Sequence, residues 1–228
     1  LGKTVQVIPH VTDCIQNWIE KSAMGADEPE ICVIELGGTV GDIESMPFVE
    51  ALRQLKYRVG DDNFCSIFVS LVPQLGVVGE QKTKPTQHGV KNLASMGLGP
   101  QIIVCRSEEP LLTETKRKVG LFCQVPPEAV VSVHDVNNTY KIPLMLQEQG
   151  VTNQLIKALR LIWRIPSLLE GWSNMASTVD KSSETVRIAL VGKYTGLADS
   201  YISVVKALEH AGMALRRKVS IDWVESSA

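Results

Sequence analysis

Residues 31–45 read ICVIELGGTVGDIES, and this stretch decides the fold class of the chain. It begins as an apolar, β-branched run, reaches a carboxylate at Glu35, and then opens into a glycine-rich turn. Such a run is typical of a buried parallel strand, so we predict a strand over Ile31–Leu36. After the turn, Ser45 can cap a helix and Pro47 can start it. Strand, loop and helix in succession are the repeating unit of α/β folds.

The same succession continues on both sides of this stretch. Further strands are predicted at Phe64–Val72, Ile102–Cys105 and Ala129–Val133. Further helices are predicted to start at Thr12 or Asp13 and at Pro85, and to cover Thr113–Phe122 and Val151–Trp163. This repetition predicts a doubly wound, mostly parallel α/β sheet.

The composition becomes polar and rich in turn residues after residue 165. We interpret residues 173–185 as an exposed linker between two domains. A new unit follows, with predicted strands at Val186–Val191 and Val219–Val224 and a helix at Asp199–Ala211. One such unit cannot build a core by itself. The predicted organisation is a first domain over residues 1–172, the linker, and an incomplete second domain over residues 186–228.

The composition excludes several classes of function. The chain has 228 residues and a formal net charge of -2, which argues against a nucleic-acid-binding protein. No apolar run approaches the roughly 20 residues that span a membrane, and no signal peptide is visible. We therefore expect a cytoplasmic protein without nucleic-acid or membrane partners.

The cysteines predict no disulfide framework. They are odd in number and include no Cys-x-x-Cys pair, and we expect buried, reduced thiols at Cys14, Cys32, Cys65, Cys105 and Cys123.

Polar residues follow the predicted strands at the ends where ligands bind in open parallel sheets. Glu35 ends the first strand, residues 74–84 follow the second, Arg106 follows the third, and His134 and Asp135 follow the fourth. Glu35 could hold Mg²⁺, which binds one or two carboxylates together with phosphate oxygens, or it could simply face water.

The glycine-rich turn carries two more acids, Asp42 and Glu44. They could accept hydrogen bonds from a base or sugar, and they could also cap the helix near Pro47. Its glycines, taken alone, favour an ordinary tight turn.

Lys82 and Lys84 flank Thr83, and Thr86 and Gln87 come just after Pro85. Two ammonium groups, hydroxyls and a predicted helix start together suit a triphosphate. The alternative is a solvated basic loop, which is also the usual interpretation of the charged run at residues 116–118.

Four motifs closely resemble the CTP synthase family: VQVIPH at 5–10, ELGGTVGDIES at 35–45, GEQKTKPTQH at 79–88 and YKIP at 140–143. The resemblance covers essentially the whole chain. It implies an amidoligase domain similar to dethiobiotin synthetase, followed by the start of a class I glutamine amidotransferase domain. It also implies ATP-dependent amination of UTP to CTP with glutamine as the nitrogen source. Mg²⁺, activation by GTP, inhibition by CTP, homotetramers and filaments belong to the same expectation.

The resemblance also implies roles for individual residues. Glu35 corresponds to a Mg²⁺ ligand. Contacts with the substrate or inhibitor nucleotide, UTP or CTP, are implied for Gln6, Asp42, Ile43, Glu44, Lys82, Thr83, Lys84, Pro85, Thr86, Gln87 and Lys118. Contacts with ATP are implied for Arg106, Asp135 and Val136.

Some family features have no counterpart in the sequence. No Gly-x-x-x-x-Gly-Lys-[Ser/Thr] loop is present, and we expect that loop and a second Mg²⁺-binding acid upstream. The glutaminase nucleophile and its partners are expected downstream, so we expect the chain alone to be inactive. Two alternatives stay open: another Mg-ATP-dependent amidoligase or carboxylase, and a non-catalytic nucleotide-binding or assembly partner of a complete enzyme.

Overall fold

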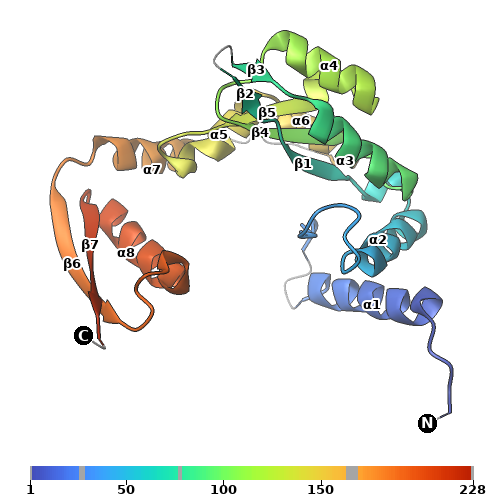
Figure 1. Ribbon diagram of the computed structural model, residues 1–228, viewed down its shortest axis with the longest axis horizontal. Helices are drawn as coiled ribbons and strands as arrows, with labels where there is room; N and C mark the ends of the chain where they lie inside the picture. Colours follow the sequence, from blue (N-terminus) through green and yellow to red (C-terminus); the bar gives the residue numbers. More distant parts are fainter. Residues whose placement is uncertain (1, 26–28, 77–78, 163–168, 227–228) are drawn as a thin grey trace. The chain divides into compact units, whose positions relative to one another are not determined.

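The structure is a computed structural model that describes residues 2–25, 29–76, 79–162 and 169–226. It divides into two compact units. The first consists of Leu1–Asp135 and Leu146–Arg164, and the second of Val136–Met145 and Ile165–Ala228. Each unit contains its own parallel sheet, which confirms the predicted α/β class (Figure 1).

The first unit is built on three parallel strands in the order β1-β4-β5. They cover Ile67–Leu71, Ile102–Ser107 and Val130–His134, and each lies within two or three residues of a predicted strand. A short antiparallel hairpin, formed by β2 at Gln74–Leu75 and β3 at Glu80–Gln81, follows β1.

The helices of the first unit agree closely with the predicted ones at their starts. They are α1 at Thr12–Ala23, α2 at Met46–Val59, α3 at Lys84–Ser95, α4 at Thr113–Cys123 and α6 at Val151–Ala158, with α5 at Ile142–Glu148 crossing from the second unit. Short turns lie at Val7–Val11, Asp61–Asn63, Pro127–Ala129, Thr139–Lys141 and Ala198–Tyr201. The predicted end of the 151–163 helix is wrong, because α6 ends at Ala158, and Trp163 lies outside the described residues.

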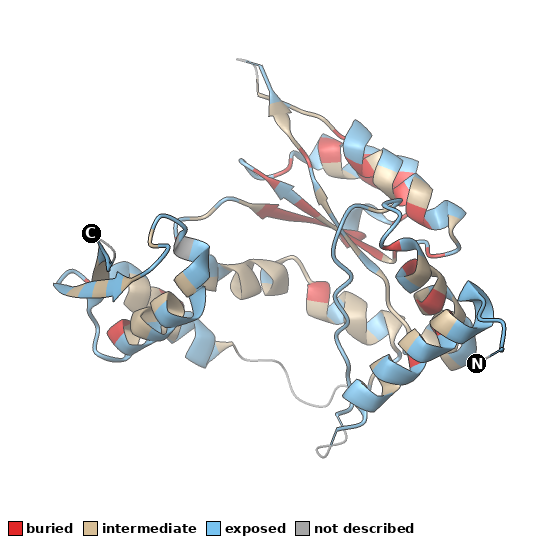
Figure 2. Ribbon diagram, turned by 60° about the horizontal axis from the view of Figure 1, so that its bottom comes forward, coloured by how far each residue is buried: buried red, intermediate tan, exposed pale blue. Residues whose placement is uncertain are grey.

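The core of the first unit lies where α3 and α4 pack on the central strands. Ile103 and Cys105 of β4 are fully buried, together with Val130 of β5, Val90 of α3 and Val119 of α4. Figure 2 shows the buried residues gathered on these strands and helix faces. The three strands β1, β4 and β5 are parallel and run in the same direction. Their carboxyl ends therefore lie at the same edge of the sheet.

The strand predicted at Ile31–Leu36 is not formed. These residues form no regular secondary structure, and they are exposed, with Val33 at 90%. A strand exists only through hydrogen bonds to a neighbouring strand, and none of the described residues supplies one here. The outer face of β1 is also exposed, at Ile67, Val69 and Leu71.

The second unit contains the parallel strands β6, at Thr185–Gly192, and β7, at Lys218–Glu225, joined through α8 at Ile202–Ala214. All three elements were predicted. The prediction of an exposed linker over residues 173–185 is wrong for most of that range, because the helix α7 covers Glu170–Lys181. None of the helices described combines the length and apolar character that crossing a bilayer requires.

Contacts with residues 136–145 explain why the predicted linker is helical. The Asn138 side chain donates hydrogen bonds to the Ala176 carbonyl oxygen and to Asp180 Oδ1, both at 2.9 Å. Lys141 Nζ lies 2.6 Å from Asp180 Oδ2. Tertiary contacts therefore order a polar stretch that composition alone assigns to a linker, and they also place residues 136–145 in the second unit rather than the first.

The cysteines differ in burial and hence in expected reactivity. Cys105 and Cys123 are buried and Cys65 is half-buried, whereas Cys14 and Cys32 are exposed, so the prediction of buried thiols is wrong for these two. Burial raises the pKa of the Cys105 thiol to about 12. Because only the thiolate reacts, iodoacetamide at about pH 8 is expected to label Cys14 and Cys32 rapidly and Cys105 only after denaturation. Peptide mass spectrometry over time measures this order, and rapid labelling of Cys105 in the folded protein would contradict the buried position.

Candidate functional site

The carboxyl edge of the first sheet brings together two of the predicted ligand-binding segments. Arg106, near the end of β4, lies with its Nη2 atom 3.1 Å from Oδ1 of Asp135, which follows β5. The Asp135 N–H donates a hydrogen bond to the Ser107 carbonyl oxygen at 3.0 Å, which continues the ladder beyond the strands. Both side chains are exposed to solvent and therefore accessible to a ligand.

The loop from the hairpin into α3 lies after β1, at the same edge. The Lys82 N–H donates to the Pro73 carbonyl oxygen at 2.9 Å, and α3 begins at Lys84. Lys84 and Pro85 are exposed in the first turn of the helix. The first N–H groups of a helix have no partner within it and can bind an anion, although in α3 Pro85 has no N–H to offer. The predicted combination of ammonium groups and a helix start is therefore present.

The two threonines of this loop are buried rather than open to a ligand. Thr86 Oγ1 lies 2.9 Å from Ser70 Oγ of β1, and Thr83 Oγ1 accepts a hydrogen bond of 2.9 Å from Gln87 Nε2. The Thr86 contact attaches the start of α3 to the sheet, and the Thr83 hydrogen bond fixes the first turn of the helix. A phosphate bound here would meet lysine side chains and backbone N–H groups, while the threonine hydroxyls hold the loop in shape.

Glu80, which the sequence analysis did not select, lies beside the loop cations. Its Oε2 atom is 2.5 Å from Lys82 Nζ. The hydrogen bond from Lys82 holds the pKa of the Glu80 carboxyl below its ordinary value, and the charge of Lys118 on α4 acts in the same direction. The alternation of Glu80, Gln81 and Lys82 in an extended segment could have indicated this pairing, because residues two apart share a face.

Gln81 attaches the hairpin to the start of α4. Its Nε2 donates to the Pro110 carbonyl oxygen at 2.9 Å, and its Oε1 accepts from the Leu112 N–H at 3.0 Å. Of the charged run on α4, Lys118 is exposed as expected, but Lys116 is half-buried and donates to Gln149 Oε1 at 2.8 Å. Burial lowers the pKa of Lys116, so the prediction of a solvated face is wrong for this residue.

Gly79 allows the hairpin to turn. It has a φ of 68°, and a Cβ atom there would lie 2.7 Å from Gln74 Nε2. Residues with a side chain rarely adopt this backbone region, so the positive φ is what favours glycine here. Among the described residues, Gln74 Oε1 is buried without a hydrogen-bond partner.

The glycine-rich turn at residues 38–45 has its own internal hydrogen bonds. Asp42 Oδ2 accepts from the Thr39 N–H at 3.2 Å, and Ser45 Oγ donates to the Asp42 carbonyl oxygen at 2.9 Å. Ser45 is the N-cap residue of α2, as predicted, but its side chain makes no capping hydrogen bond to the helix. Ile43 is 83% exposed and Glu44 is exposed, and both can reach a ligand.

Glu35, Gln6 and the turn residues Asp42, Ile43 and Glu44 are not brought to the sheet edge by any contact that the described residues make. Glu35 lies in the exposed segment before the glycine-rich turn, and Gln6 lies before α1, where its backbone N–H donates to His10 Nδ1 at 2.9 Å. Val136 belongs to the second unit. The described residues contain no cluster of three or more His, Cys, Asp or Glu placed to hold a metal. Glu35 fits Mg²⁺ only as a single ligand beside phosphate oxygens and water.

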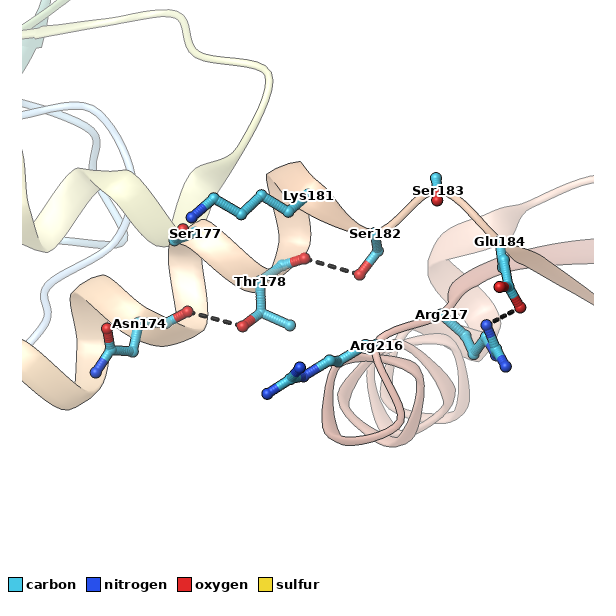
Figure 3. Close-up of a pocket in the computed structure, with 9 residues that line it drawn as sticks. All are labelled: Asn174, Ser177, Thr178, Lys181, Ser182, Ser183, Glu184, Arg216 and Arg217. Carbon is cyan, nitrogen blue, oxygen red and sulfur yellow. Dashed lines mark hydrogen bonds and ion pairs between the residues drawn. The ribbon is translucent and has the colours of Figure 1, made fainter.

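A cavity of about 550 Å³ lies in the second unit, between α7 and the turn before β7 (Figure 3). It contains Lys181 and Arg216, while Arg217 is ion-paired with Glu184. Its lining has no aromatic side chain and includes none of the predicted site residues. We assign no ligand to it.

The fold and these contacts define an α/β protein with parallel sheets and a cationic loop at the carboxyl edge of the first one. A family profile described as "CTP synthase N-terminus" matches residues 1–161, and the chain therefore belongs to the CTP synthase family.

Curated relatives match the chain over its full length. It is 53% identical over 247 residues to CTP synthase of Dictyostelium discoideum, covering 100% of this chain and 43% of that protein. It is 53% identical over 234 residues to CTP synthase 1 of Homo sapiens, covering 100% and 40%. It is 54% identical over 241 residues to CTP synthase of Candida glabrata, covering 100% and 41%. The chain thus spans about two fifths of the length of these relatives.

Proposed function

We propose that this chain supplies the nucleotide-binding part of an enzyme that forms CTP from UTP. In this reaction ATP phosphorylates O4 of UTP, and ammonia derived from glutamine displaces the phosphate. Family membership supports the assignment. The observation that carries it is the loop at residues 79–88, whose lysines and helix start lie at the carboxyl edge of the sheet. A second triphosphate besides ATP requires such a loop, whereas a small carboxylate substrate does not.

Within this proposal the loop binds the UTP triphosphate. Lys82 and Lys84 would contact phosphate oxygens by charge-assisted hydrogen bonds, and the first N–H groups of α3 would add uncharged donors. Lys118 is available from α4 because Gln81 attaches the hairpin to that helix. Arg106 and Asp135 would contact ATP, whose phosphoryl transfer depends mainly on positioning and charge stabilisation.

Glu35 is the proposed Mg²⁺ ligand, and the ion supplies charge neutralisation at the transferred phosphoryl group. Replacing Glu35 with glutamine in the intact native protein removes the charge and keeps the size. We expect the Mg²⁺ concentration for half-maximal CTP formation to rise by on the order of tenfold. Glu30→Gln, an exposed neighbour in the same segment, is the control and should leave the Mg²⁺ dependence unchanged. An unchanged Mg²⁺ requirement in the Glu35 variant would remove this assignment.

Competition for a labelled nucleotide tests the proposed substrate. Purified native protein is equilibrated with radiolabelled CTP. Unlabelled UTP, ATP and biotin are then added in turn, with biotin representing a small carboxylate ligand. Displacement by UTP at a lower concentration than by ATP supports the triphosphate loop as a pyrimidine nucleotide site. Displacement by none of them would refute the assignment.

The remaining family properties are part of the same proposal. They are activation by GTP, inhibition by CTP, and assembly into homotetramers and filaments. We also expect the 228-residue chain alone to form no CTP, because its sequence contains no loop of the kind that encloses the ATP phosphates.

A further inference from the structure

The loop that would bind the triphosphate carries an anion of its own. Lys82 Nζ already has the Glu80 carboxylate as a partner at 2.5 Å. The two side chains remain 39% and 64% exposed, so water screens their attraction. An ion pair of this kind is weak, and an incoming anion of higher charge can replace the carboxylate.

The backbone of the hairpin dictates this pairing. The ladder of β2 and β3 continues through the hydrogen bond from Lys82 N–H to Pro73, so residues 80–82 stay extended. Glu80 and Lys82 therefore lie on one face, while Gln81 lies on the other and holds the hairpin to the start of α4. The loop therefore presents Lys82 and Glu80 on the same face.

The charges around Glu80 are not balanced. Lys82 contacts it directly, and Lys118 contributes a second positive charge to its surroundings. Only Lys82 contacts the carboxylate, and Lys118 acts on it by longer-range attraction, so the surroundings of Glu80 are cationic. A triphosphate, with several negative charges, interacts with both cations more strongly than one carboxylate does. The displaced carboxylate would then turn toward solvent.

We propose that Glu80 is a positioning residue that competes with the triphosphate for Lys82: it holds the ammonium group in place when the site is empty and lowers the affinity for nucleotide. This inference rests on the proposed function and adds a residue to it. Removing the carboxylate is expected to strengthen nucleotide binding, although Glu80 belongs to the binding loop.

The test is a double-mutant cycle on the intact native protein, with UTP affinity measured by calorimetry. Glu80→Gln is expected to lower the Kd for UTP by about threefold, the scale of an exposed ion pair. Glu80→Asp keeps a carboxylate and should stay closer to the wild type. In the Lys82→Ala background the effect of Glu80→Gln should disappear, because the carboxylate then has no cation to occupy. Glu128→Gln, at the opposite end of β5, makes the same charge change away from the loop and is the matched control.

The outcomes distinguish a wrong role for Glu80 from a wrong assignment of the UTP site. If Lys82→Ala leaves UTP affinity unchanged, the proposed nucleotide site itself is wrong. If Lys82→Ala weakens UTP binding but Glu80→Gln does not strengthen it, Glu80 does not compete with the triphosphate, while the nucleotide site remains supported. If Glu80→Gln still strengthens UTP binding to the full extent in the Lys82→Ala background, the effect is general charge repulsion. That result would also contradict competition for Lys82.

Discussion

Replacing Lys82 with alanine in the intact native protein is expected to weaken UTP binding by about tenfold to a hundredfold. The charge-assisted hydrogen bonds from Lys82 to phosphate oxygens are lost. The lower part of this range is favoured because Lys82 must first release Glu80. ATP binding should change by no more than about twofold, because Lys82 belongs to the UTP loop in this account. Calorimetric titration with each nucleotide measures both values.

Lys91→Ala is the matched control for this substitution. Lys91 is exposed on the same helix, α3, but lies farther along it than Lys84. The Lys91→Ala substitution removes the same charge and leaves the first turn of α3 unchanged, so UTP affinity should stay near the wild-type value. Equal losses of UTP and ATP affinity in the Lys82 variant would contradict the separation of the two nucleotide sites.

Replacing Ile103 with alanine is expected to have the largest effect on stability. Ile103 is fully buried in the central strand β4 and belongs to the cluster with Val90 and Val130. Removing its side chain loses buried apolar surface and leaves a cavity, at a cost of about 2–5 kcal/mol. Chemical denaturation should show an earlier midpoint with little change in slope.

The same substitution at Ile162, which is 84% exposed, is the control. It should change the free energy of unfolding by less than about 0.5 kcal/mol. Similar losses at the two positions would mean that β4 is not the centre of the first unit's core.

The correctly predicted strands and helices have local sequence patterns that match the burial of their residues in the structure. Ile102–Ser107 and Val130–His134 are apolar runs that lie at the centre and one edge of the sheet, and their pattern reflects that burial. The run at Ile31–Leu36 has the same pattern, but a strand also needs a partner that a local pattern does not contain. The helix α7 shows the opposite case, because Asn138 supplies contacts that the polar composition of α7 does not reveal.

The candidate site was predictable in its charges but not in the direction of its side chains. Lys84 and Arg106 are exposed and Lys82 is half-buried, and all three lie at or just beyond the carboxyl ends of strands, as the sequence indicates. The burial of Thr86 depends on its contact with Ser70 of β1, which lies 16 residues earlier in the chain. Glu80 was overlooked because a single acid among lysines has no distinctive pattern until the hairpin places it on the same face as Lys82.

The most direct test is to measure CTP itself. The intact native protein is incubated with UTP, ATP, glutamine and Mg²⁺, and the nucleotides are separated by chromatography. The account predicts that CTP accumulates and that omitting either UTP or ATP abolishes it. Folded native protein that binds both nucleotides yet forms no CTP would contradict the proposed reaction and favour a non-catalytic nucleotide-binding partner.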